Sequence, residues 1–354
     1  MKNTLVALAA MSTFGAYAQS TVTVFGILDA ALAIGTGNVS STTTLASSTV
    51  QGNRLGFRGT EDLGGGLKAN FLLEGYVNID DGTGRTSNTN NQASGATAAQ
   101  AGNQGFTFNR WAYVGLSGEF GEVRLGRVNA TPFYNHVQYD PFNLSGAGAS
   151  IVFKMRTGGV NSVGVSNAIN YSSPRMGGFF AEVQYFMGEN ASNAANPDAG
   201  TGTGLRLGYG DNPLSATLAW SRTSGVPGAS ITTTSVGASY DLGVAKIMAL
   251  WNKDDVTAAA TTTQTGWFLG ATIPAGPGFA KVTYGKSETS AAGNAGASQF
   301  AVGYQYPLSK RTYITAAVSS VNNYNGQTGN GLFGSGVGVN GSGTGIDLGL
   351  RHSF

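Results

Sequence analysis

Apolar and polar residues alternate with a period of two along most of this chain. The alternation is clearest at 22–34, 67–74, 299–306 and 346–354, where one parity holds Val, Leu, Ile, Phe or Tyr. The other parity in these segments is mostly Thr, Asp, Lys, Gly or Gln. Strict alternation is typical of a β-strand with one apolar and one wet face. No stretch after residue 18 carries the 3.6-residue apolar stripe of a helix, so the sequence predicts an all-β protein.

Turn signals divide the chain into sixteen strands. Seven short segments rich in Gly, Pro, Asp and Asn predict tight turns; they are 61–66, 118–121, 174–178, 211–213, 241–243, 274–278 and 308–311. Eight longer stretches rich in Gly, Ala, Thr, Ser and Asn predict loops; they lie near 36–50, 80–104, 128–165, 190–200, 224–230, 254–262, 289–296 and 323–343. Seven turns and eight loops, taken in alternation, join sixteen strands.

Short turns that alternate with long loops indicate a transmembrane barrel. Outer-membrane barrels have an even strand number, short turns at one end and long loops at the other. At sixteen strands, side chains no longer fill the lumen, and it holds water. The sequence therefore predicts a 16-stranded antiparallel transmembrane β-barrel.

Aromatic residues support this prediction. Most of them share the apolar parity, many near predicted strand ends, where rings at the two lipid–water boundaries form girdles. Ordinary β-propensity would explain any single ring, but the set favours a girdle. The set is Tyr185, Tyr209, Trp220, Tyr240, Trp251, Trp267, Tyr284, Tyr304, Tyr306, Tyr313 and Phe354.

The first eighteen residues have the pattern of a secretory signal peptide. Lys2 supplies a positive charge, residues 5–11 form a short apolar core, and Ala16-Tyr17-Ala18 is an A-x-A cleavage site. The apolar core is too short to span a bilayer. We expect cleavage before Gln19, which leaves residues 19–354 as a single barrel domain.

Composition narrows the functional classes. Glycine makes up 55 of 354 residues, charged residues only 11%, and cysteine is absent, which argues against an ordinary cytoplasmic enzyme and removes disulfides and thiolate chemistry. The net charge is +2 without a basic run, so nothing favours nucleic acid as a partner. No segment approaches the roughly 18 apolar residues of a membrane-spanning helix.

Several long motifs resemble one protein family. They read TVFGILD at 23–29, RLGFRGTEDLGGGLKA at 54–69, GLSGEFGEVRLGR at 115–127, NYSSP at 170–174, GGF at 177–179, YPLSKRT at 306–312 and GLRHSF at 349–354. In this order they resemble the general porins of β-proteobacteria, the neisserial and comamonad type. The resemblance runs from Thr23 to Phe354, and the motif at 54–69 is the most specific.

The resemblance implies a homotrimer of 16-stranded barrels in the outer membrane of a Gram-negative bacterium. In this family the third external loop folds into the lumen and makes the constriction, where arginines of the wall face it and set ion preference. Phe354 resembles the C-terminal aromatic residue that serves as an assembly signal. The implied partners are outer-membrane lipid and lipopolysaccharide, small ions and hydrophilic solutes.

Charged residues on the wet parity are the candidates for ion selection, because a narrow charged passage concentrates ions of opposite sign. Parity places Arg54, Arg58 and Lys68 on the wet face of predicted strands two and three. The third loop, 128–165, follows Arg127 and holds the remaining candidates. These are Asp140, Lys154 and Arg156.

Two arginines match constriction positions of the family. Arg54 matches one directly, and Arg110 resembles another, although its parity is that of Val114, so a bulge or a strand end must turn it inward. A further family arginine, expected a few residues before Asn170, is missing here. These charges predict a mild preference for anions; alternatively, they are only a solvated wall with little effect on selectivity.

The sequence thus predicts a general diffusion porin that works without cofactor, metal or reaction. His136 and Asp140 lie four residues apart, but a metal or catalytic site needs further ligands. A substrate-specific porin of the same fold would need an aromatic or polar track in the lumen. A barrel enzyme would need a Ser/His or Asp/His set, and an adhesin a large folded insert.

Overall fold

The computed structural model describes residues 21–92, 105–157, 159, 162–225, 229–258, 260–291 and 293–354. Within these ranges, strands account for most of the chain. They are β1 (Thr21–Gly37), β2 (Ser41–Ser47), β3 (Arg54–Gly64), β4 (Leu67–Tyr76), β5 (Trp111–Gly118), β6 (Gly121–Asn129), β7 (Gly164–Ser172), β8 (Phe179–Phe186), β9 (Gly202–Asp211), β10 (Leu214–Ser224), β11 (Ser230–Asp241), β12 (Lys246–Thr257), β13 (Thr261–Ala275), β14 (Gly278–Thr289), β15 (Gly296–Pro307), β16 (Thr312–Tyr324) and β17 (Ser342–Ser353). The helices are α3 (Thr131–Tyr139) and α4 (Ile151–Lys154).

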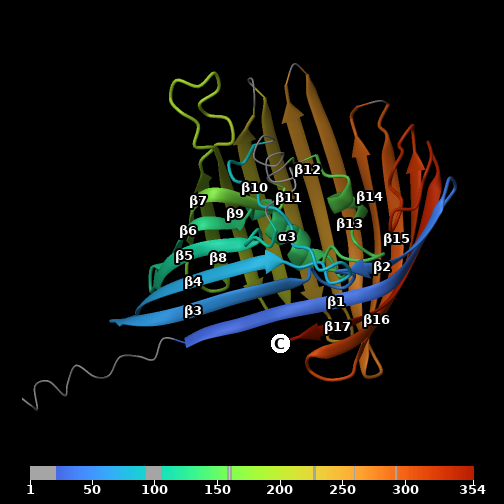
Figure 1. Cartoon of the computed structure of the whole chain (residues 1–354), viewed down its shortest axis with the longest axis horizontal. Coiled ribbons are helices and arrows are strands. Elements are labelled where there is room, and N and C mark those ends of the chain that lie inside the picture. Colours follow the sequence, from blue (N-terminus) through green and yellow to red (C-terminus); the bar gives the residue numbers. More distant parts are fainter. Residues whose placement is uncertain are drawn as a thin grey trace, which may run out of the picture.

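The strands form one closed antiparallel barrel (Figure 1). From β3 to β17 each strand pairs with the next along the chain, and β1 closes the circle on β17, from Ile27 opposite Ser353 to Gly37 opposite Gly343. Both β2 and β3 pair with β1, one after the other along its length. They therefore share one position in the wall, and seventeen strands make sixteen positions, which confirms the predicted 16-stranded all-β fold.

The two faces of the wall differ as the alternation predicts. On one face, large apolar side chains are exposed, among them Trp251, Trp267 and Leu269. On the other face, polar side chains such as Asn252, Asp254 and Gln264 are buried. We call these the apolar face and the polar face. An exposed apolar band around a closed barrel is the arrangement that lipid requires.

All seven predicted tight turns lie at junctions between consecutive strands. Two predicted long loops are wrong. At 36–50, β1 and β2 continue to a three-residue connection at 38–40, and the chain leaves the sheet only at 48–53. At 254–262, β12 and β13 extend to 257 and from 261. In both places a Thr- or Ala-rich composition looks like a loop although the strands continue through it.

The connection between β6 and β7 contains α3 and α4, which the sequence did not predict. The expectation of no helix failed because each is shorter than the window in which an apolar stripe can be recognised. Pro132 at the helix start favours α3, and the Ser150 side chain caps α4. Among the described residues no helix is long and apolar enough to cross a membrane.

The chain ends at the barrel seam. Backbone N–H groups and carbonyls of Gly26 and Phe354 exchange two hydrogen bonds, at 3.2 and 3.1 Å. The Phe354 ring lies over Gly26, where a Cβ would come within 2.4 Å of it. The terminal aromatic residue thus completes the β1–β17 closure. The predicted signal peptide, residues 1–18, lies outside the described residues.

Candidate pore constriction

The wall is interrupted at residues 48–53, between β2 and β3. Asp29 of β1 organises this strand break: its carboxylate accepts hydrogen bonds from the backbone N–H groups of Thr49, Val50 and Gln51, at 3.0, 2.5 and 2.9 Å. The Thr49 hydroxyl donates a fourth, at 2.8 Å. A carboxylate has about four acceptor sites. Asp29 is therefore fully engaged in holding the break and is buried on the polar face.

Two arginines meet one carboxylate directly beside the strand break. Arg54 Nε lies 3.5 Å from Glu74 Oε2, and Arg110 Nε lies 2.5 Å from Glu74 Oε1. The Arg110 backbone N–H also donates to the Glu74 carbonyl, at 3.1 Å. We call Arg54, Glu74 and Arg110 the arginine cluster. Two positive charges against one negative charge leave it with a net charge of +1.

The strand break packs directly on the arginine cluster. A Cβ at Gly52 would lie 2.5 Å from the Tyr76 hydroxyl and 3.1 Å from Arg110 Nη1, so only glycine fits without a shift. The Tyr76 ring lies beneath two guanidinium groups, 5.1 Å from that of Arg110 and 3.9 Å from that of Arg85. Cation–π contacts of this kind fix the arginines against one side of the wall.

Helix α3 packs on the polar face of β9 to β12. Asn135 Nδ2 donates to Ser235 Oγ at 2.9 Å, and His136 Nε2 lies 3.0 Å from Asn252 Oδ1. Burial, followed by the charge of Arg156, lowers the pKa of His136 well below its usual value, so the imidazole is neutral. These contacts place the segment against wall positions that have the parity of the lumen.

Asp140 organises the segment that follows α3. Its carboxylate accepts hydrogen bonds from the backbone N–H groups of Phe142, Leu144 and Ser150, at 2.8, 3.1 and 3.3 Å. Only 3% of Asp140 is exposed, and burial raises the pKa of its carboxyl to about 6 in spite of these donors. Asp140 thus shapes the loop from within, whereas the sequence suggested a charge that lines the passage.

The loop then crosses to the strand break. The Ala147 N–H donates to Asp347 Oδ2 of β17 at 2.7 Å, and the Ala147 carbonyl accepts from Gln299 of β15 at 3.0 Å. A Cβ at Gly146 would lie 2.2 Å from the Thr49 carbonyl oxygen. The loop and the strand break are therefore in direct contact, and the loop reaches the side of the barrel that holds the arginine cluster.

The other predicted loop charges differ in their surroundings. Arg156 is buried and lies 3.5 Å from Asp254 of β12. Lys154, at the end of α4, is exposed. Arg127 donates to the carbonyls of Asn109 and Asn88, at 2.6 and 3.1 Å, and to a serine hydroxyl of β7. Arg156 and Arg127 are held by internal partners, whereas Lys154 has no ion pair within 4.0 Å among the residues that the structure describes.

Arg58 and Lys68 lie nearer the short-turn end of β3 and β4. Both are exposed, and the Arg58 guanidinium lies 5.1 Å from the Phe25 ring. Arg58 and Arg124 of β6 line one polar cavity of about 490 Å³. Arg124, which lies 2.5 Å from Glu122, was missed; its wet parity, shared with Glu122, was the signal for it.

Two further cations, Lys281 and Arg351, have wet parity in the sequence. Lys281 Nζ lies 5.8 Å from the Phe142 ring of the loop, and Arg351 lies 5.5 Å from the Tyr313 ring. Neither has an ion pair within 4.0 Å in the described part of the chain. The parity of β14 and β17 places both on the wet face, so the sequence contained the signal.

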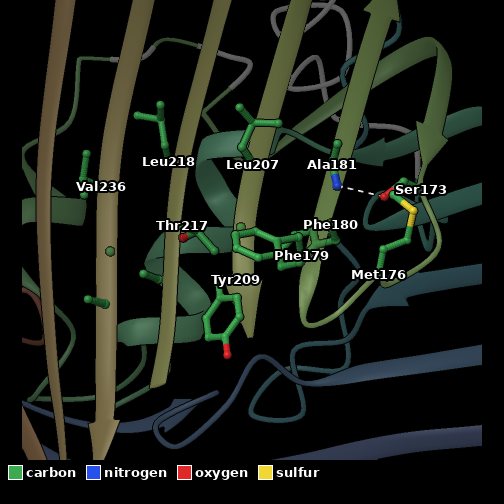
Figure 2. Close-up of a pocket in the computed structure, with 14 residues that line it drawn as sticks. Ser173, Met176, Phe179, Phe180, Ala181, Leu207, Tyr209, Thr217, Leu218 and Val236 are labelled. Atoms are coloured by element: carbon green, nitrogen blue, oxygen red, sulfur yellow. Dashed lines mark hydrogen bonds between the residues drawn. The ribbon is translucent and has the colours of Figure 1, made fainter. Parts of the chain in front are cut away.

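One large groove lies on the outside of the barrel. It has a volume of about 660 Å³ and is lined on the apolar face of β8 to β11 by side chains such as Phe179, Leu207 and Leu218 (Figure 2). Tyr209 stands at one end, and the Ala181 N–H donates to Ser173 Oγ nearby. A groove on the lipid side has no access to the polar face, so it is not part of a passage through the barrel.

A closed barrel with an exposed apolar band and a polar inner face that carries charged side chains defines the class of outer-membrane pore proteins. The chain belongs to the Gram-negative porin family, whose sequence model matches residues 4–327. It is 34% identical over 373 aligned positions to outer membrane porin protein 32 of Delftia acidovorans, with all of both chains covered. An outer membrane porin of Bordetella pertussis is 27% identical, again over both full lengths. The protein is accordingly an outer-membrane porin.

Solved structures agree with this assignment. The anion-selective porin from Comamonas acidovorans superposes with a TM-score of 0.83 at 32% identity, covering 95% of this chain and all of that one. The trimer form of OmpT from Vibrio cholerae gives a TM-score of 0.65 at 13% identity over 95% and 99% of the two chains. Because OmpT shares only 13% identity with this chain, its similarity is evidence for the fold alone.

Proposed function

We propose that the protein is a general diffusion porin with a mild preference for anions. Ions and small hydrophilic solutes pass through the water-filled lumen, and the loop between β6 and β7 narrows it against the strand break. The contact between Gly146 and Thr49 supports this position of the loop. The relative from Comamonas acidovorans is described as anion-selective, which agrees with the proposed preference.

The observation that carries the proposed preference is the arginine cluster. Its net charge of +1 lies beside the loop contact, and Lys281 and Arg351 add two cations without ion pairs among the described residues. Cations within a narrow passage raise the local anion concentration. Screening lengths of about 8–10 Å at physiological ionic strength restrict this effect to charges near the narrowest part. Arg58, Lys68 and Lys154 contribute less because they are more exposed.

The protein functions as a homotrimer that is exported with the help of the signal peptide at 1–18 and surrounded by phospholipid and lipopolysaccharide. Phe354 acts as its assembly signal. Transport through such a pore needs no catalytic residue. Of the two histidines, His136 faces Asn252, and the Nδ1 atom of His352 lies 2.9 Å from the Thr312 hydroxyl.

Liposome swelling tests the function directly. Proteoliposomes are placed in iso-osmotic solutions of neutral sugars of increasing size, and the swelling rate is measured. General diffusion predicts rates that fall smoothly with solute size. A substrate-specific porin would instead pass one solute far faster than others of equal size. Absence of swelling with correctly folded barrels would contradict both forms of the proposal.

A further inference from the structure

Three basic side chains project from the apolar face of the barrel wall. Arg222, Lys253 and Lys286 lie on β10, β12 and β14, and each has the parity of an exposed apolar residue of its own strand. All three strands are close here to the long-loop end of the barrel (Figure 1). A basic residue on the lipid side is costly at the bilayer midplane but nearly free of cost at the headgroup level. We therefore infer that the three cations lie at the level of the lipid headgroups in the leaflet on the long-loop side.

Strand register relates these cations to one another. Arg222 lies opposite Thr232, which lies opposite Asp255, two residues beyond Lys253. Lys253 lies opposite Thr234 on one side and Thr265 on the other. Trp251, two residues below Lys253, pairs with Trp267, and Trp267 pairs with Lys286. Tryptophan rings of this kind concentrate at the lipid–water boundary. The patch thus combines an aromatic base, a row of threonine hydroxyls and three cations.

The charges of the patch are only partly satisfied within the protein. Lys253 Nζ lies 2.8 Å from Asp255, whose other hydrogen bond comes from the Thr263 hydroxyl at 2.6 Å. Lys286 Nζ lies 5.3 Å from the Tyr324 ring, and no carboxylate within the described ranges pairs with it. Arg222 is exposed and has no ion pair in the part of the chain that the structure describes.

We propose that Arg222, Lys253 and Lys286 bind the phosphorylated sugar headgroup of lipid A, the membrane anchor of lipopolysaccharide. This inference rests on the proposed function, in which lipopolysaccharide surrounds the barrel, and assigns it a site. Adjacent strands lie about 4.8 Å apart, and each successive cation is also offset by two residues along the strands, so successive cations are about 12 Å apart. Two phosphates at opposite ends of a disaccharide suit this spacing, and Thr234 and Thr265 offer hydroxyls to the sugars between them.

Native mass spectrometry of the purified protein in detergent tests the site. The probes are diphosphorylated lipid A, dephosphorylated lipid A, phosphatidylglycerol and inorganic phosphate. The variant Arg222→Gln/Lys253→Gln/Lys286→Gln removes the cations. The control, Lys310→Gln/Arg311→Gln, removes two exposed cations from the short turn between β15 and β16, at the other end of the barrel.

We expect the wild type and the control to retain diphosphorylated lipid A, and the triple variant to bind it at least about tenfold more weakly, because each basic residue near a charged membrane surface contributes to binding. Equal binding by the triple variant, or an equal loss in the control, would overturn the proposal. So would binding of dephosphorylated lipid A, phosphatidylglycerol or inorganic phosphate as tightly as diphosphorylated lipid A.

Channel recording separates this proposal from the proposed function. The three cations lie outside the lumen, so the triple variant is expected to keep the wild-type single-channel conductance, which also shows that it is folded. A wild-type protein that conducts but does not bind diphosphorylated lipid A would overturn the lipid site alone. Lipid A binding without conductance would overturn the diffusion pore and leave the lipid site standing.

Discussion

The two halves of the barrel wall are built differently. From β10 to β17 the strands are 11–15 residues long, and no register shift occurs between them. From β3 to β8 they are 8–11 residues long, with irregular register at Asp62/Gly64 and at Gly126/Val128. The strand break at 48–53 adjoins this second half. The regular half receives α3 and α4, whereas the irregular half holds the arginine cluster.

This difference separates the parts of the sequence that determine the fold from those that determine the passage. Regular alternation of apolar and polar residues specifies the strands of the closed wall. Different apolar residues can replace one another on its outer, lipid-facing side. Breaks and bulges re-aim individual side chains. The strand break places Gly52 against Arg110 and Tyr76, which a continuous strand would not do. The residues that we propose to select ions thus lie where the regular pattern fails.

Reversal of ion preference is the largest effect that we expect. The variant Arg54→Gln/Arg110→Gln changes the charge of the arginine cluster from +1 to −1, because Glu74 remains. We expect the chloride preference to be lost or reversed, with a permeability ratio changed by about tenfold. Reversal potentials in a KCl gradient measure this ratio.

The control for that variant keeps the charge of the cluster constant. In Arg54→Gln/Glu74→Gln, only Arg110 remains charged, and the sum is still +1. We expect this variant to retain a chloride preference. If the two variants had the same reversal potential, the cluster would not be the source of selectivity.

Loss of the Asp29 carboxylate should destabilise the irregular half. In Asp29→Asn, the amide cannot accept from all four donors of the strand break, and each buried donor left without a partner costs about 1–3 kcal/mol. We expect a lower unfolding temperature and a larger, noisier single-channel current. Ser319→Ala in the regular half removes one hydrogen bond from Gln299, which costs about 0.5–1.5 kcal/mol, so it should have the smaller effect.

A bulkier residue at Gly237 should displace α3 from the regular half. A Cβ there would lie 2.1 Å from the Tyr139 ring, and overpacking typically costs about 1–3 kcal/mol. We expect Gly237→Val to alter the single-channel conductance and to expose the loop to protease. Ala238→Val, one residue along but on the apolar face, is the control, and an equal change in that variant would argue against α3 in the lumen.

The smallest effect that we expect is a pH dependence of the chloride preference, caused by titration of the Asp140 carboxyl. Its carboxyl, with a pKa of about 6, is mostly neutral at pH 5 and mostly charged at pH 7.5. The added negative charge lies near Lys281, so chloride preference should weaken slightly as the pH rises through 6. Reversal potentials at the two pH values measure this, and Asp140→Asn should reduce the change. An unaltered pH dependence in that variant would assign the titration to another group.

The fold could be predicted almost completely because period-two alternation is a local signal that survives in every strand. The strand predicted at 67–74 follows from it, and the tight turn predicted at 118–121 from its turn residues also lies between two strands. The chain at 36–50 was misread because Thr-rich strands have loop-like composition. The helices in the β6–β7 connection were missed because α3 is stabilised by distant partners such as Asn252 and Ser235.

Of the candidate site, the sequence could predict only which face of the wall each side chain occupies, because this follows from the parity of its position. Parity placed Arg54 on the wet face, but it could not show that Arg54 and Arg110 share Glu74, because these residues are brought together by the strand break and the end of β5. It also could not show that Asp140 points into its own loop. Such contacts depend on tertiary packing, which no local pattern records.

The central claim is that the arginine cluster gives the pore its preference for anions. Its most direct test is the reversal potential of single wild-type channels in a planar bilayer under a KCl gradient. We expect a reversal potential of the sign that favours chloride. A reversal potential that favours potassium would contradict the role of the cluster, although the barrel would remain an open pore.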